Sequence, residues 1–211
     1  MEKEGMARLF VGTFLDADKA ATLGNLKHLN SGLSERWQIK ARFVPLPKLH
    51  LTWLFLGDVE ESRIEDLKVD LEAIIDDWKR TKDNHPFQIE YDRLAAWSSL
   101  KSPRVLVLES TSECPRAESL NREISRGLSK YCDRSEKVQR FKRFRPHLTV
   151  CRFSPDRNQR TEDSVRRTLS DFQLPEDFFP LQHHIGTVSL IESQLNAGPN
   201  SYSSIFDIAL N

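Results

Sequence analysis

The tripeptide His-Leu-Thr occurs twice in this chain, and an apolar residue follows each copy. The copies are His-Leu-Thr-Trp at 50–53 and His-Leu-Thr-Val at 147–150. Each lies shortly after a proline, in a stretch whose apolar and β-branched residues predict a strand. Because histidine is scarce, at six among 211 residues, composition does not account for the repeat. A widely spaced repeat of this kind indicates that two parts of the chain share one architecture.

Side chains alternate along a strand, so the polar residues of each copy fall on one face. His50 and Thr52 are expected to share a face, as are His147 and Thr149, with the intervening leucines buried behind them. With the two strands face to face across a cleft, two imidazoles and two hydroxyls would converge on one small group.

The remaining chain alternates between strand-like and helix-like stretches. Strands are predicted at 8–14, 50–56, 87–91, 104–109, 147–153, 187–192 and 202–209, with a loop between the third and the fourth. Helices are predicted over 20–33, 62–78 and 115–128, with a short one at 164–169. Consecutive strands recur without the long crossover that parallel pairing needs, which favours an α+β fold with antiparallel sheets. No clear linker interrupts the chain, so residues 1–211 are expected to form a single domain.

Charge and cysteine content limit the class of protein. The net charge is zero, yet residues 58–92 carry 12 acidic against 5 basic residues, and residues 122–167 carry 14 basic against 6 acidic. The basic segment suits a polyanion, although solvated helix faces and loops would show the same asymmetry. Three cysteines without a C-x-x-C pair argue against a disulfide scaffold or a zinc module. With no signal peptide or membrane-spanning stretch, a cytoplasmic protein is expected.

Paired imidazoles and hydroxyls suit chemistry at a phosphate. In-line displacement at phosphorus needs a base for the attacking oxygen and an acid for the leaving oxygen. Two histidines with pKa values of about 6.5 can hold these opposite protonation states together near neutral pH. A metal site formed by His50, His147 and Cys151, which strict alternation puts on the face of His147, is the alternative. It lacks a carboxylate ligand and any short-range ligand spacing.

Sequence likeness extends well beyond the two His-x-Thr-x motifs. The matching segments are R-L-F-V at 8–11, L-H-L-T-W-L-F-L-G at 49–57, P-R-V-L-V-L at 103–108, F-R-P-H-L-T-V-C-R at 144–152 and I-E-S-Q-L-N-A-G-P at 191–199. These segments occur in the order typical of one family. In them the chain resembles the bacterial and archaeal RNA 2′,3′-cyclic phosphodiesterases, the LigT-like branch of the two-histidine phosphoesterases, also called 2′-5′ RNA ligases. Trp53 departs from the family, which more often has a smaller aliphatic residue there, and Cys151 stands where alanine is frequent.

This resemblance implies a bilobal α+β fold, in which two antiparallel sheets flank a central cleft and helices cover the outer faces. It implies that RNA 2′,3′-cyclic phosphate ends are hydrolysed to 2′-phosphates without metal or other cofactor. Carried over, His50 is the proton donor to the leaving 3′ oxygen and His147 the acceptor that activates water. Thr52 and Thr149 would bind phosphate oxygens. The expected partners are RNA with a cyclic phosphate end or a small cyclic nucleotide, and the protein is expected to be a monomer.

Two other functions use the same fold. One is reversible 2′-5′ ligation of RNA such as tRNA halves, in which a 5′-hydroxyl replaces water as the attacking group. The other is a non-catalytic RNA-binding module. The intact His and Thr pairs disfavour this second alternative, since a binding site needs hydrogen-bond donors but not two proton-transfer groups.

Charged residues near the second motif are candidates for holding RNA. Lys142, Arg143 and Arg145 could bind the RNA backbone or form a solvated loop. Strict alternation puts Arg152 on the face opposite His147, where an ion pair is at least as good an interpretation as a phosphate contact.

Aromatic residues are the other candidates. Phe10, Phe55 or Phe153 could stack on a terminal base, although aromatic residues in strands more often belong to the core. Tyr202 either reaches the cleft or lies on an edge strand. The remaining histidines, at positions 28, 85, 183 and 184, have no partner motif and are assigned no role.

Overall fold

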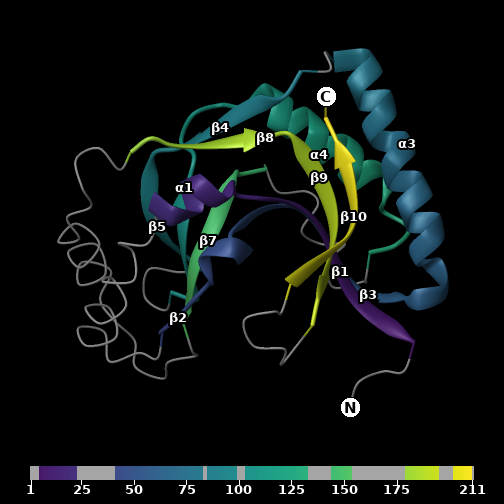
Figure 1. Cartoon of the computed structure of the whole chain (residues 1–211), viewed down its shortest axis with the longest axis horizontal. Coiled ribbons are helices and arrows are strands. Elements are labelled where there is room, and N and C mark those ends of the chain that lie inside the picture. Colours follow the sequence, from purple (N-terminus) through teal and green to yellow (C-terminus); the bar gives the residue numbers. More distant parts are fainter. Residues whose placement is uncertain are drawn as a thin grey trace.

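The computed structural model describes residues 5–22, 41–82, 85–98, 103–132, 144–153, 179–194 and 202–210 (Figure 1). Four sequence predictions fall on other residues: the greater part of the helix over 20–33, the short helix at 164–169, the basic residues Lys142 and Arg143, and the last segment of family likeness beyond residue 194. They stay predictions.

Ten strands lie within these ranges and form two antiparallel sheets. They are β1 Met6–Phe14, β2 Ala41–Phe43, β3 His50–Glu60, β4 Phe87–Tyr91, β5 Arg93–Trp97, β6 Val105–Glu109, β7 His147–Phe153, β8 Leu181–Ile185, β9 Thr187–Ser193 and β10 Tyr202–Ala209. The large sheet has the order β10-β9-β1-β3-β7-β6-β5, with β2 paired to β7, and β4 pairs with β8 in the small sheet. All registers are antiparallel, which confirms the predicted α+β class.

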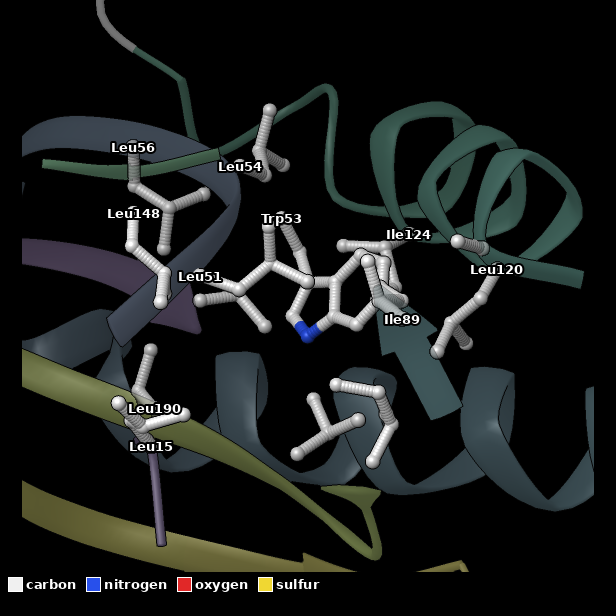
Figure 2. Close-up of a cluster of buried hydrophobic side chains, with 14 of the residues drawn as sticks. Leu15, Leu51, Trp53, Leu54, Leu56, Ile89, Leu120, Ile124, Leu148 and Leu190 are labelled. Carbon is white, nitrogen blue, oxygen red and sulfur yellow. The ribbon is translucent and has the colours of Figure 1, made fainter. Parts of the chain in front are cut away.

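Helices pack on the large sheet and close one hydrophobic core. The α-helices are α1 Ala17–Thr22, α3 Ile64–Lys82 and α4 Pro115–Gly127, and the short 3-10 helices η2 Leu46–Lys48 and η3 Glu61–Arg63 flank β3. Figure 2 shows Trp53 of β3 beside Leu120 and Ile124 of α4. Burial of this apolar face, rather than helix propensity, is the main reason that α3 and α4 are stable. None of the helices in the described ranges is long and apolar enough to cross a membrane.

Three short strands were not predicted. β5 occupies the segment where the sequence predicted a loop, and β2 and β8 lie where no element was expected. β5 contains two adjacent alanines and its residues lack a clear alternation of burial, so its strand signal is weak. Pairing with β6 decides its conformation, because cross-strand contacts override a weak intrinsic preference. The loop prediction for this segment is therefore wrong.

Candidate active site

The two motif strands, β3 and β7, are neighbours in the large sheet. They meet where Leu51 pairs with Leu148 in antiparallel register. Both leucines are fully buried in the core. Because side chains alternate along a strand, the residues that flank each leucine point to the opposite face of the sheet.

These flanking residues form a group of two imidazoles and two hydroxyls. Continued from the leucine pair, the antiparallel register puts His50 opposite Thr149 and Thr52 opposite His147. Diagonal neighbours across two such strands are roughly 7–8 Å apart, a span over which both imidazoles can reach one phosphate. The four predicted residues thus lie on one face. Their strands lie side by side rather than face to face, because pairing satisfies the backbone hydrogen bonds of both.

Each motif strand has a β-bulge at the fourth residue of its motif. The register of β3 with β1 skips Trp53, and the register of β7 with β6 skips Val150. Both skipped residues are buried in the core, and so are Leu54 and Cys151, which follow them. An extra residue shifts the alternation by one, so the residues beyond each bulge exchange faces.

The bulge in β7 corrects two predictions made from strict alternation. Arg152 pairs with Val105 and His147 pairs with Glu109, two β6 residues that share a face, so Arg152 lies on the face of His147. Cys151 turns into the core and is fully buried, so the alternative metal set is not assembled. Within the described ranges, no three His, Cys, Asp or Glu side chains are grouped so that they could hold a metal ion.

Both imidazoles are oriented by the same local hydrogen bond. His50 Nδ1 lies 2.8 Å from the carbonyl oxygen of Lys48, and His147 Nδ1 lies 2.8 Å from that of Arg145. A carbonyl oxygen only accepts, so Nδ1 carries the hydrogen in each ring. Nε2 is then the nitrogen that exchanges a proton with a substrate. The motif therefore repeats in tautomer as well as in sequence.

His50 lies among aromatic rings and is 7 % exposed. The ring centroids of Phe10, Tyr202 and Phe14 lie 4.7, 5.1 and 6.1 Å from that of the imidazole. Burial and, to a smaller extent, the positive charge of Arg152 lower the pKa of His50 to about 4, against the opposing effect of the Lys48 carbonyl. In the unliganded protein His50 is therefore neutral at pH 7.

His147 has a more exposed and more polar environment. The Trp97 ring centroid lies 4.2 Å from that of the imidazole. Burial lowers the pKa of His147, and the Arg145 carbonyl opposes this shift. The charges of Arg145 and Arg152 also lower this pKa, whereas the carboxylate of Glu109 raises it. The two copies of the motif thus place their histidines in chemically different surroundings.

Aromatic candidates divide between the site and the core. Tyr202 contacts His50 and so reaches the site, and the buried ring of Phe10 contacts both. Phe55 is on the same face as Phe10, with which it pairs, and is 41 % exposed. Phe153 is a core residue. Phe55 and Arg152 each lie five positions after a motif histidine and just past a bulge.

Trp97, Glu109 and Phe14 belong to the site but were not predicted from sequence. None of them lies in a repeated motif, and only strand pairing brings them beside the histidines. His183 is fully buried: its Nδ1 lies 3.0 Å from the Tyr91 hydroxyl and its Nε2 3.0 Å from the Phe14 carbonyl. It links β8 to the end of β1, which is a structural role.

Comparison with known proteins supports a common family. A sequence model of the 2′-5′ RNA ligase superfamily matches residues 26–197. The chain is 27 % identical over 163 residues to the RNA 2′,3′-cyclic phosphodiesterase of Aquifex aeolicus (strain VF5), covering 77 % of this chain and 78 % of that protein.

Solved structures share the fold. The crystal structure of E. coli LigT in complex with 3′-AMP superimposes with a TM-score of 0.68 at 20 % identity, covering 97 % of this chain and 98 % of that one. The crystal structure of TT0787 from Thermus thermophilus superimposes with a TM-score of 0.66 at 21 % identity, covering 96 % and 97 %. At such identities the likeness concerns the fold.

Proposed function

The chain belongs to the 2′-5′ RNA ligase superfamily, and on that premise we propose that it hydrolyses RNA 2′,3′-cyclic phosphate ends to 2′-phosphates. The observation that carries the proposal is the placement of two equally oriented histidines and two threonines on one face of β3 and β7. The name of the Aquifex relative, RNA 2′,3′-cyclic phosphodiesterase, supports the same reaction.

The reaction needs one proton removed and one proton supplied. In the proposed mechanism Nε2 of His147 accepts a proton from water as the water oxygen bonds to phosphorus. The bond from phosphorus to O3′ breaks, and Nε2 of His50 donates a proton to O3′. The product keeps its phosphate on O2′, and no step calls for a metal ion.

Negative charge grows on the non-bridging oxygens in the transition state. The hydroxyls of Thr52 and Thr149 would donate hydrogen bonds to these oxygens. Arg152, which the bulge turns to this face, adds a positive charge that acts on both histidines. An anion bound here raises the pKa of both imidazoles, since opposite charges stabilise each other. Substrate binding thus favours the protonated His50 that the donor role needs.

The rings beside the site support the proposed substrate class. Phe55 is exposed on the face that holds the histidines, and Tyr202 and Phe10 lie against His50. The exposed ring of Phe55 and the partly exposed ring of Tyr202 suit the terminal base of an RNA or of a small cyclic nucleotide, whereas Phe10 is 2 % exposed and packs beneath them. Arg152 is exposed as well and suits the phosphate.

The pH dependence of kcat/KM tests the protonation states. The active form carries one proton on the histidine pair. Burial lowers the pKa of His50 to about 4 and that of His147 below 6.5. In the free protein, both imidazoles are therefore neutral above pH 6.5. Lowering the pH below about 4 also protonates His50, so that neither imidazole can accept a proton. We therefore expect a bell-shaped profile with its maximum between pH 4 and 6.5, measured with folding followed by circular dichroism. A maximum above pH 7 would contradict these protonation states.

Product analysis tests the proposed function directly. An oligonucleotide with a 2′,3′-cyclic phosphate end is incubated with the protein in EDTA, and the product is analysed by mass spectrometry and by its susceptibility to a 3′-specific phosphatase. We expect the gain of one water and a phosphate that resists this enzyme. Binding of the oligonucleotide without hydrolysis would support the RNA-binding alternative. Activity abolished by EDTA and restored by zinc would overturn the metal-independent mechanism.

Ligation is a second candidate, favoured by the family description. In this reaction a 5′-hydroxyl replaces water and a 2′-5′ bond forms. A second RNA half with a 5′-hydroxyl, added at high concentration to the same assay, tests it. A joined product supports ligation, and hydrolysis alone argues against it.

A further inference from the structure

A buried carboxylate lies beside His147 and has no part in the mechanism proposed above. Glu109 of β6 is 1 % exposed and pairs with His147 in the register of β6 and β7. Paired residues point to the same face of a sheet, so the carboxylate of Glu109 and the imidazole of His147 lie on one face at neighbouring positions. A buried carboxylate is costly unless partners neutralise it and donate to it.

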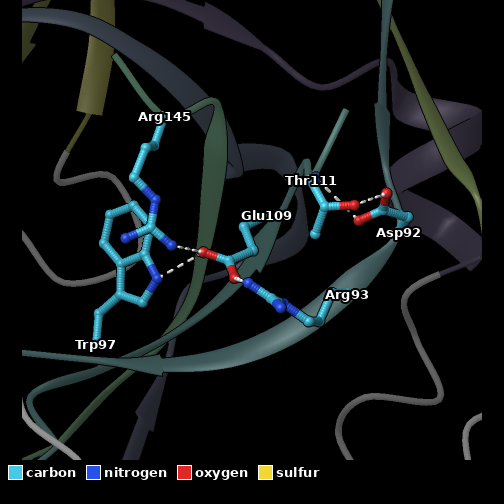
Figure 3. Close-up of polar contacts among 6 residues, drawn as sticks. All are labelled: Asp92, Arg93, Trp97, Glu109, Thr111 and Arg145. Carbon is cyan, nitrogen blue, oxygen red and sulfur yellow. Dashed lines mark hydrogen bonds and ion pairs between the residues drawn. The ribbon is translucent and has the colours of Figure 1, made fainter. Parts of the chain in front are cut away.

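Three side chains donate to Glu109, as Figure 3 shows. Arg93 donates to Oε1 from Nε at 2.8 Å and also from Nη2. The Trp97 indole donates to Oε2 at 2.8 Å, and Arg145 Nη2 donates to the same oxygen at 2.5 Å. Both arginine side chains are more than half exposed. Glu109 is therefore the buried centre of a cluster whose cations face solvent.

Two of these three partners also contact His147. The ring of Trp97 packs against the imidazole, at 4.2 Å between centroids. The backbone carbonyl of Arg145 accepts the hydrogen of Nδ1 at 2.8 Å, and its guanidinium lies over the Trp97 ring at 4.6 Å from the centroid. A single carboxylate thus holds both the ring beside His147 and the residue that sets its tautomer.

Among the residues that the structure describes, no carboxylate acts on His50 in this way. The charge of Arg152 lowers the pKa of His50, and so would a proton on His147 or His183, while its ring packs against aromatic side chains. His147 is faced by Arg145 and Arg152 from its own segment, by Arg93 and Glu109 from β5 and β6, and by His50 from β3. Glu109 is the anion in this group.

We propose that Glu109 is a positioning residue for His147: through Trp97 and Arg145 it holds the orientation and tautomer of the imidazole, and its charge stabilises the imidazolium formed when His147 accepts a proton. The inference rests on the proposed function in assigning this proton transfer to His147. A buried acid that orients a histidine base is an effective arrangement because the base is preorganised before the proton moves.

The Glu109→Gln variant tests this role, since glutamine keeps the shape but removes the charge. We expect kcat on a cyclic-phosphate-ended oligonucleotide to fall by about 10- to 100-fold, with KM within about twofold because Glu109 touches no substrate. Glu90→Gln, an exposed residue of β4, is the matched control and should leave both constants unchanged. A raised KM with unchanged kcat would overturn the proposal and assign the cluster to RNA binding through its arginines.

A second readout does not depend on activity. Histidine resonances are followed by NMR as a function of pH, and we expect Glu109→Gln to lower the pKa of His147 while that of His50 is unchanged. The Trp97→Phe variant keeps a ring beside His147 but loses the donor to Glu109, so it tests the same link if Glu109→Gln fails to fold. An unchanged titration of His147 in a folded Glu109→Gln variant, or an unchanged kcat in a folded Trp97→Phe variant, would overturn the role of Glu109. Absence of hydrolysis by the unmodified protein would overturn the proposed function alone.

Discussion

Replacing His147 with alanine is expected to lower turnover of a 2′,3′-cyclic phosphate end by at least about 100-fold, and His50→Ala is expected to do the same. Each variant removes the Nε2 that the fixed tautomer offers to the substrate. The remaining imidazole cannot act as acid and base in one step. Losses of up to about 10,000-fold lie within the usual range of general acid–base catalysis.

The measurement is steady-state turnover at the optimal pH, with circular dichroism to confirm that each variant folds. His184→Ala is the matched control: it is an exposed histidine on β8 and should keep full activity. A double variant lacking both imidazoles should be little slower than either single variant, because the two groups act as a unit. Near-normal turnover of either His50→Ala or His147→Ala would contradict the two-histidine mechanism.

Replacing Trp53 with alanine is expected to lower the free energy of unfolding by about 3–5 kcal/mol. The indole is 2 % exposed, and its ring centroid lies 5.5 Å from that of Phe144 in a stacked arrangement. Its nitrogen donates to the Thr13 hydroxyl at 2.9 Å, which in turn donates to the Thr187 carbonyl at 2.7 Å. Removal leaves a large cavity behind the site and takes away the hydrogen bond donated to Thr13.

Urea unfolding followed by circular dichroism gives this free energy. Val69→Ala is the control, because Val69 is an apolar residue of α3 that is 66 % exposed, and its change should stay within about 0.5 kcal/mol. Trp53→Phe keeps a ring but loses the hydrogen-bond donor, so its loss of unfolding free energy should lie between those of Val69→Ala and Trp53→Ala. A loss below about 1 kcal/mol in Trp53→Ala would show that the core repacks around the site.

Periodicity was a good guide to the elements with strong local patterns. β4, β7 and α4 were predicted within one residue of their observed bounds, because each has a clear apolar pattern, whereas β3 starts as predicted but extends to Glu60 rather than ending at residue 56. β5 was missed because its alanines have little strand preference and its partner strand decides its conformation. The bulges at Trp53 and Val150 were missed for a related reason: an extra residue is defined only by the register of a neighbouring strand.

Residues close in sequence determine the tautomer of each motif histidine and the face on which each motif threonine lies. His50 and His147 each bond to a carbonyl only two residues earlier, so the tautomer of the imidazole is set within the motif segment. Alternation then puts each threonine on the face of its histidine, which a reader of the chain can predict without coordinates.

Tertiary structure decided which groups surround these histidines. Pairing of β3 with β7 set them side by side, and the bulge in β7 turned Arg152 toward them. Pairing with β1 and β6 placed His50 among aromatic rings and His147 beside Glu109. These neighbours come from distant parts of the chain, and a pattern of polar and apolar residues specifies the face of a strand but not its neighbouring strands. The two identical tripeptides therefore lie in different chemical environments only once the sheet has formed.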